Sequence, residues 1–222
     1  MSRWENWEKP LAFLMWSVLP IVTIFSIFAY LDQGGHYNRV ILIGSLGSIA
    51  FAIPLLLRFT ERLIVPWALI VMIYASLINH LIGDFLMFYT IYPWFDKVSH
   101  TLSSITVAII VFMFLIMVDH YIRSVSIPVK LMPYLVVTTV CLLGVIWEIF
   151  EWFAGYMGVE MQFYLEDTVY DLVTNFIGAS FAAYVSYRYV LQRGLEHVVL
   201  SLEVDDFMER IANGWERMMG AL

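Results

Sequence analysis

The segment that decides the fold class is residues 98–118, which read VSHTLSSITVAIIVFMFLIMV. It contains no Asp, Glu, Lys or Arg, and its length matches the roughly 20 residues that a helix needs to cross the hydrocarbon core of a bilayer. Further apolar stretches of similar length lie on either side of it, at roughly 11–31, 40–57, 63–83, 131–153 and 168–190. The sequence therefore predicts an all-α, polytopic membrane bundle of about six transmembrane helices.

The composition excludes most other classes of protein. Of the 222 residues, 61% are hydrophobic and 14% are charged, whereas a soluble domain has about 45–50% apolar and about 25% charged residues. A soluble globule of this length could not bury so much apolar surface, which argues against a soluble enzyme or a disordered chain. The net charge of −7 argues against a nucleic-acid partner. The single cysteine, Cys141, excludes an internal disulfide and a cysteine-based zinc cluster.

The basic residues predict the orientation in the membrane. Lys and Arg together number 12, and all but two of them fall on one side of the predicted spans. The exceptions are Arg39 and Lys97. Because cytoplasmic loops carry the excess of Lys and Arg, we expect a multi-pass protein of the plasma membrane with both termini in the cytoplasm. The loops at 32–39, 84–97 and 154–167 then face outward.

The sequence predicts two parts, a transmembrane domain over 1–193 and a cytoplasmic tail over 194–222. Apolar residues of the tail recur at the spacing of an amphipathic helix: Val204, Phe207, Met208, Ile211, Trp215 and Met218. Such a helix either lies on membrane lipid or packs against a protein partner or a second copy of the chain. Its acidic opposite face, which anionic lipid would repel, favours the protein partner.

Acids, histidines and an amide gather near the outer ends of four predicted spans. The spacings of three or four residues place the members of each set on one helical face. We therefore expect them to meet in a common chamber that opens away from the cytosol. In chain order they are His80 and Asp84, Asp96 and His100, Glu148 and Glu151, and then Asp167, Asp171 and Asn175.

The charges in this set do not balance, because Lys97 and two histidines cannot neutralise six carboxylates. Crowded carboxylates either share protons or hold a cation. Carboxylates, imidazoles and an amide suit a divalent ion such as Mg²⁺, Mn²⁺, Zn²⁺ or Ca²⁺, and suit haem less well. Structural alternatives stay open: Asp96 and Asp167 as helix N-caps, Asn175 as a link between helices, and the whole set as a polar network or an ion pathway.

Two classes of function fit this reading. In the first, an enzyme hydrolyses a lipid-linked phosphate or ester with a metal ion, Glu151 acts as general base and Lys97 binds the substrate anion. The sequence carries no recognised catalytic signature for such a reaction. In the second, the protein is a non-enzymatic subunit of a membrane complex, or a small carrier. The candidate metal ligands are His80, Asp84, Asp96, His100, Glu148, Asp167, Asp171 and Asn175.

The chain resembles the YjdF-like and VanZ-like integral membrane proteins over roughly residues 80–190. Three motifs carry the resemblance in order: Asp96-Lys97-x-x-His100, Glu148-x-x-Glu151-Trp152, and Asp167-Thr168-x-x-Asp171-x-x-x-Asn175-x-x-Gly178. The resemblance implies a small bundle of membrane helices, with the shared acids and His100 as candidate site residues. The VanZ-like branch is associated with low-level glycopeptide resistance, which is not transferred to this chain, and the YjdF-like branch implies no particular reaction.

Overall fold

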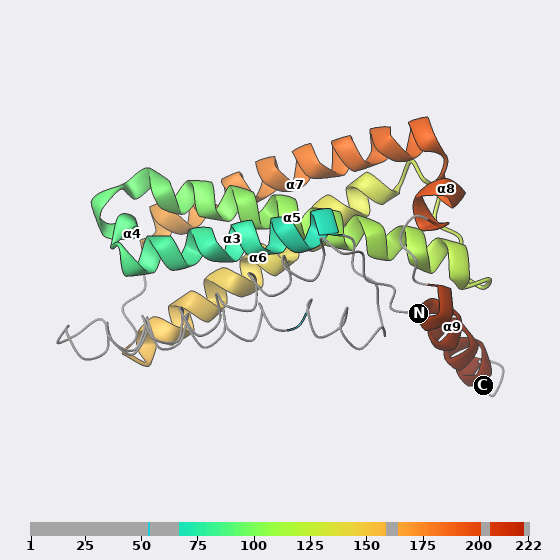
Figure 1. Ribbon diagram of the computed structural model, residues 1–222. Helices are drawn as coiled ribbons and strands as arrows, with labels where there is room; N and C mark the ends of the chain where they lie inside the picture. The colour runs from blue at the N-terminus through green and yellow to red at the C-terminus, as the bar shows by residue number, and fades with distance from the viewer. Residues whose placement is uncertain (1–52, 54–66, 159–163, 201–204, 220–222) are drawn as a thin grey trace, which may run out of the picture.

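The computed structural model describes residues 53, 67–158, 164–200 and 205–219 (Figure 1). The predicted all-α class is confirmed for this part of the chain, which forms seven helices. The predicted spans at 11–31 and 40–57 lie outside the described residues, apart from Ile53. The helices are α3 (Trp67–Phe85), α4 (Phe88–Ile91), α5 (Pro93–Tyr121), α6 (Met132–Tyr156), α7 (Leu165–Arg193), α8 (Leu195–Leu200) and α9 (Asp205–Met219).

Four predicted spans lie largely within the described residues, and their described residues are helical apart from Leu131, the N-cap of α6. By length and composition, α5 and α6 are suited to cross a membrane, and Leu69–Asp84 forms a shorter apolar helix. Helix α5 begins at Pro93 rather than near residue 98, because proline is well suited to the first position of a helix. Asp96 and Lys97, which the sequence placed in or beside a loop, therefore lie in the first turns of α5.

The central helix of the described bundle is α5, which packs against α3, α6 and α7 (Figure 1). It runs parallel to α7, since Lys97 near the start of α5 contacts Asp167 near the start of α7. The connection between them, α6, runs in the opposite direction. The bundle therefore has an acidic end, where α5 and α7 begin and α6 finishes, and a basic end with Arg123, Lys130, Arg188 and Arg193.

Small residues bring α7 close to its neighbours. A Cβ atom added to Gly178 would lie 2.7 Å from the backbone oxygen of Thr101 in α5, so this position has no room for a side chain. On the other side, a Cβ on Gly144 of α6 would lie 2.8 Å from the Asn175 amide nitrogen. Close packing through small residues is typical of helix pairs in membranes, and here it holds α5, α6 and α7 together beside the acidic end.

The tail packs onto the bundle instead of standing apart from it. Val198 and Val199 of α8 and Met208 of α9 join the hydrophobic core formed by α5, α6 and α7. Helix α9 confirms the predicted amphipathic segment, and its apolar residues Ile211 and Trp215 are exposed. Because α8 contacts both α5 and α7, the short helix after Gly194 belongs structurally to the bundle.

Candidate metal centre

A charged cluster lies between the first turns of α5 and α7. Asp96, Lys97 and His100 come from α5, and Asp167 and Asp171 come from α7. The intervals of four residues from Asp96 to His100 and from Asp167 to Asp171 are about one helical turn, so each pair faces the neighbouring helix. We refer to these five residues as the charged cluster.

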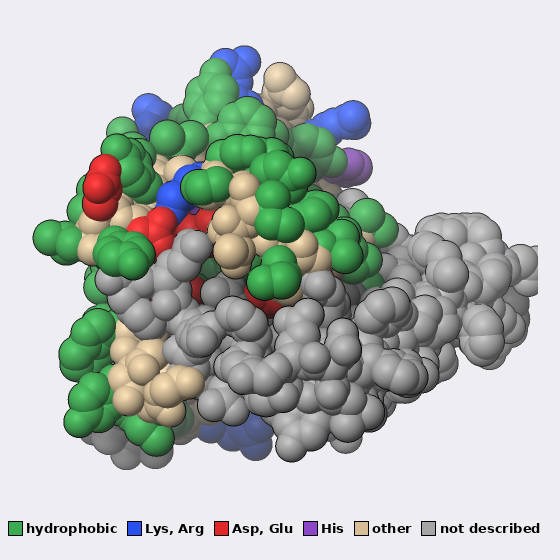
Figure 2. All heavy atoms as spheres, turned by 90° about the vertical axis from the view of Figure 1, so that its left-hand side faces the viewer, with side chains coloured by type: hydrophobic (Ala, Val, Ile, Leu, Met, Phe, Trp, Pro, Cys, Tyr) green, Lys and Arg blue, Asp and Glu red, His purple; other side chains and the backbone are tan. Residues whose placement is uncertain are grey.

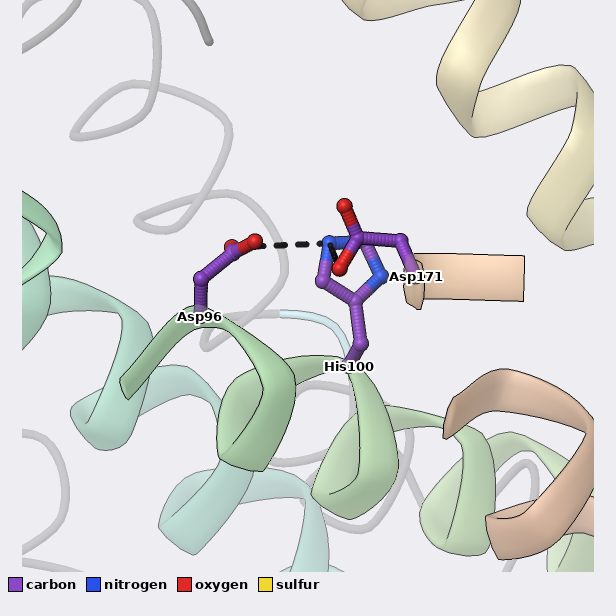
Figure 3. Close-up of side chains that lie close together, drawn as sticks. All are labelled: Asp96, His100 and Asp171. Atoms are coloured by element: carbon purple, nitrogen blue, oxygen red, sulfur yellow. Dashed lines mark ion pairs between the residues drawn. The ribbon is translucent and has the colours of Figure 1, made fainter. Parts of the chain in front are cut away.

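Three members of the charged cluster converge on one point (Figure 3). His100 Nε2 lies 3.6 Å from Asp96 Oδ1 and 3.6 Å from Asp171 Oδ1. One ligand atom from each of the three residues lies within 4.8 Å of the others. His100 and Asp171 are buried, with 2% of the Asp171 side chain exposed. This trio has the composition and spacing of a metal-binding group.

Lys97 acts as the counter-ion of the Asp96 and Asp171 carboxylates. Its ammonium group is 2.9 Å from Asp96 Oδ2 and 2.7 Å from Asp171 Oδ1, and it also pairs with Asp167 Oδ1. A single lysine therefore contacts three aspartates and links α5 to α7 through two of them. Asp171 Oδ1 is the atom that both Lys97 and His100 approach.

A second layer of polar contacts supports His100. Asn175, one turn beyond Asp171, accepts a hydrogen bond from Ser104 Oγ at 2.6 Å, and its side chain also interacts with His100. Gly144 and Gly178 pack closely beside these residues. Outer contacts of this kind fix the orientation of a ligating imidazole. The sequence named Asn175 as a candidate ligand, and the structure shows its amide oxygen bonded to Ser104, a residue that the sequence did not single out.

The two glutamates of α6 make different interactions. Glu148 interacts electrostatically with Asp96, Lys97 and Asp167. Its Oε1 atom is buried and has no hydrogen-bond partner in the part of the chain that the structure describes. Glu151 accepts a hydrogen bond at 2.9 Å from the indole of Trp147, one turn earlier on α6.

His80 lies in a different network, made mainly of hydroxyl groups, between α3, α4 and α5. Its Nδ1 atom is 2.8 Å from the Tyr89 hydroxyl, and its Nε2 atom is 2.8 Å from Ser103 Oγ. Ser103 in turn pairs with Ser76 at 2.9 Å. We call this set, completed by Asn79 and Ser99, the hydroxyl network. Asp84, one turn after His80, is partly buried and makes interactions of its own.

The possible capping roles of Asp96 and Asp167 are not what the structure shows. The N-cap positions are Tyr92 for α5 and Tyr164 for α7, so both aspartates lie inside the first turn of their helices. Acidic residues in a first turn interact favourably with the helix dipole. Both are therefore available to the charged cluster.

The charged cluster reaches the surface at the acidic end of the bundle. Figure 2 shows acidic and basic side chains together on this face, bordered by hydrophobic side chains. About a fifth of the Lys97 and Asp167 side chains is exposed, at 22% and 23%. The exposed aromatic residues at this end include Trp94, Trp152, Tyr156 and Tyr164. Tryptophan and tyrosine are enriched where a membrane protein meets the lipid headgroups.

Comparison with known proteins identifies a family but no characterised relative. Residues 11–192 match the family described as predicted membrane protein (DUF2238). No curated protein and no solved structure matches the chain. The match covers most of the 222 residues and includes all four long helices of the described bundle. The chain therefore belongs to the DUF2238 family of predicted membrane proteins.

Proposed function

We propose that the protein binds a divalent metal ion between α5 and α7, with Asp96, His100 and Asp171 as ligands. The observation that carries the proposal is the placement of two carboxylate oxygens 3.6 Å from one imidazole nitrogen. At metal–ligand bonds of about 2.0–2.2 Å, neighbouring ligand atoms lie about 3–4 Å apart. The trio therefore needs only a small closure, of roughly 1 Å across its widest separation, to surround one ion.

The charge at this point supports a cation. When ionised, the three aspartates of the charged cluster exceed Lys97 by two negative charges, which is the charge of one divalent ion. The buried Oε1 atom of Glu148 adds an acceptor close by that lacks a hydrogen-bond partner among the described residues. A buried polar atom without a partner is costly, and a cation, directly or through water, would supply one.

The ligand types narrow the choice of ion. Two carboxylates and one imidazole suit Mn²⁺ or Zn²⁺ better than the softer, thiolate-preferring ions. Three protein ligands leave coordination positions for water or substrate, as in catalytic zinc sites. Asn175 and Ser104 would hold the His100 ring in place from behind, as outer-shell residues do in metal proteins.

The proposed reaction is hydrolysis of a lipid-linked phosphate or ester. The hydrophobic rim around the charged cluster, with Trp94, Trp152 and Tyr156 exposed, fits a site at headgroup depth. A bound metal ion would supply Lewis-acid activation of water and of the substrate oxygen. Glu151 is the proposed base, and Lys97 the proposed group for the substrate anion.

The finer membrane topology is also part of this proposal. It comprises six spans, cytoplasmic termini and an acidic end that faces away from the cytoplasm, in keeping with the YjdF-like and VanZ-like resemblance. The separation of Arg123, Lys130, Arg188 and Arg193 from Lys97 along the described helices supports that orientation.

A second candidate function is that of a non-enzymatic subunit or small carrier. The observation that favours it is the Lys97 bridge, which joins α5 to α7 through the carboxylates of Asp167 and Asp171. The exposed residues Ile211, Trp215 and Met218 of α9 offer an apolar face to a partner protein or a second copy. Stoichiometric co-purification of another membrane protein would favour this function over hydrolysis.

The test is metal binding by the full-length protein in detergent. The purified chain, stripped with a chelator, is titrated with Mn²⁺ and Zn²⁺ by calorimetry, and its metal content is then measured after dialysis. We expect one ion per chain, greatly weakened by His100→Ala and unchanged by His120→Ala. His120 is a matched control, since it lies exposed near the other end of the same helix. Folded wild-type protein that binds no divalent ion would overturn the proposal.

A further inference from the structure

Asp171 Oδ1 would have to interact with two cations, the Lys97 ammonium group and the proposed metal ion. Asp171 Oδ1 accepts a hydrogen bond from the Lys97 ammonium group at 2.7 Å and lies 3.6 Å from His100 Nε2. The ion proposed above would bind between His100 and this same oxygen. Asp171 is 2% exposed, so water has little access to stabilise a rearrangement of this carboxylate.

Lys97 and the ion would also repel each other. An ammonium group and a divalent ion on one carboxylate oxygen would lie only a few ångströms apart, in a partly buried place where water screens charge poorly. Of the remaining Lys97 partners, Asp96 Oδ2 belongs to the carboxylate whose Oδ1 faces His100, whereas Asp167 Oδ1 belongs to a residue outside the trio. Lys97 can therefore give up Asp171 and keep its contact with Asp167.

We propose that Lys97 is a tethered cation that competes with the metal ion for Asp171, so that ion binding releases the ammonium group toward the open side of the cluster. This inference rests on the proposed metal site and adds its regulation. In the ion-free state Lys97 bridges α5 and α7. In the ion-bound state the same ammonium group is freed from Asp171 and becomes available to an anionic group of a substrate. Metal binding then precedes anion binding.

The first test replaces the ammonium group by an apolar side chain of similar length. Lys97→Met is expected to raise the affinity for Mn²⁺ by about tenfold or more, because it removes both the competitor and the repulsion. Lys130→Met is the matched control, since Lys130 is exposed in the loop before α6, and it should leave the affinity unchanged. Equal or weaker binding by Lys97→Met, in a variant that melts like the wild type, would overturn the inference.

The second test uses the wild-type protein and does not depend on a variant that folds. An amine-specific acylating reagent is applied with and without saturating Mn²⁺, and the modification of each lysine is followed by mass spectrometry. Because 22% of the Lys97 side chain is exposed, the reagent can reach it. We expect Mn²⁺ to increase labelling of Lys97 several-fold while labelling of Lys130 stays constant. Unchanged or reduced labelling of Lys97 would contradict the competition.

The failure of this inference can be told apart from failure of the metal site. Wild-type protein that binds Mn²⁺, without tighter binding by Lys97→Met, overturns the competition and leaves the proposed metal site in place. If the folded wild type binds no ion, the proposed metal site falls and this inference falls with it, even where Lys97→Met binds one. If neither folded protein binds an ion, both proposals fall.

Discussion

Two polar regions, the hydroxyl network and the charged cluster, both include residues of α5. They differ in the contacts that their histidines make. In the hydroxyl network, His80 has a hydroxyl group 2.8 Å from each ring nitrogen. In the charged cluster, His100 approaches its carboxylate neighbours only to 3.6 Å, and the aspartates outnumber the lysine. Both regions link helices, and in the charged cluster three aspartates contact a single lysine.

The comparison teaches which of the two histidines suits a structural role. With a proton on Nδ1, His80 donates to Tyr89 and accepts from Ser103, so the neutral ring fits its surroundings. Hydrogen bonds of this type join helices within membranes. The Nε2 atom of His100 instead lies 3.6 Å from a carboxylate oxygen of each of two aspartates, and the Asn175 side chain also interacts with His100. That arrangement is typical of a metal ligand with an outer-shell partner.

The largest expected effect comes from neutralising Asp171. Asp171→Asn removes the carboxylate that both His100 and Lys97 approach, so we expect the affinity for Mn²⁺ to fall by roughly 100-fold or more, beyond the loss typical of outer-shell changes. Calorimetric titration in detergent measures this loss. Glu196→Gln, an exposed change on α8, serves as the control. Unchanged Mn²⁺ affinity in Asp171→Asn would contradict the assignment of the charged cluster, rather than the hydroxyl network, as the metal site.

The next effect tests the close approach of α7 to α5. Gly178→Ala places a Cβ atom 2.7 Å from the Thr101 backbone oxygen, and we expect a loss of stability of about 1–3 kcal/mol. Thermal unfolding in detergent measures this, and Mn²⁺ affinity should fall with it because the charged cluster spans the two helices. Gly214→Ala on α9 is the control, because a Cβ there has nothing within 4 Å. Equal melting temperatures for the two variants would contradict this packing.

The helices were largely predictable from the sequence, while their ends were not. Hydropathy predicts the apolar centres of α3, α5, α6 and α7 because lipid-facing and core residues are both apolar. Hydropathy did not predict the start of α5. Residues 93–97, which include the charged residues Asp96 and Lys97, are helical although the sequence suggested a loop there. In the same way, Val198 and Val199 of α8 form too short an apolar run to reveal that they pack into the core.

Within the site, the intervals along each helix were predictable and the pairing between helices was not. The spacing of Asp96 and His100 predicted that the two side chains share one helical face, but it could not reveal that His80 of α3 contacts Ser103 and Tyr89. The recurrence of Ser76 with His80 and of Ser99 with Ser103, each four residues apart, was the available signal for the hydroxyl network. The position of Lys97 among three aspartates depends on the close approach at Gly178, which no spacing along one helix can show.

A smaller effect separates the two histidines directly. His80→Ala removes hydrogen bonds to Tyr89 and Ser103, and we expect it to lower the free energy of unfolding by about 1–3 kcal/mol. The affinity for Mn²⁺ should stay within about twofold of the wild type, since the lost hydrogen bonds are not part of the charged cluster and the two effects should be nearly independent. Thermal unfolding and calorimetry on the same preparation measure both quantities. A large loss of Mn²⁺ affinity in His80→Ala would indicate that His80 is itself a metal ligand.

The smallest effect is expected from the outer layer of the charged cluster. Ser104→Ala removes the 2.6 Å hydrogen bond to Asn175 and loosens the support behind His100. We expect roughly tenfold weaker Mn²⁺ binding, at the lower end of what outer-shell changes cause, with about 1 kcal/mol lost in stability. Ser103→Ala, the neighbouring change in the hydroxyl network, should leave the affinity unchanged. Equal affinities for the two serine variants would argue that Asn175 does not orient His100.

The most direct measurement of the central claim is pulsed electron paramagnetic resonance on the full-length protein loaded with one equivalent of Mn²⁺. The proposed ligand set predicts coupling of the ion to the nitrogen of one imidazole. This coupling should vanish in His100→Ala and persist in His80→Ala. Bound Mn²⁺ without nitrogen coupling, or coupling that survives His100→Ala, would contradict the assignment of Asp96, His100 and Asp171 as the metal ligands.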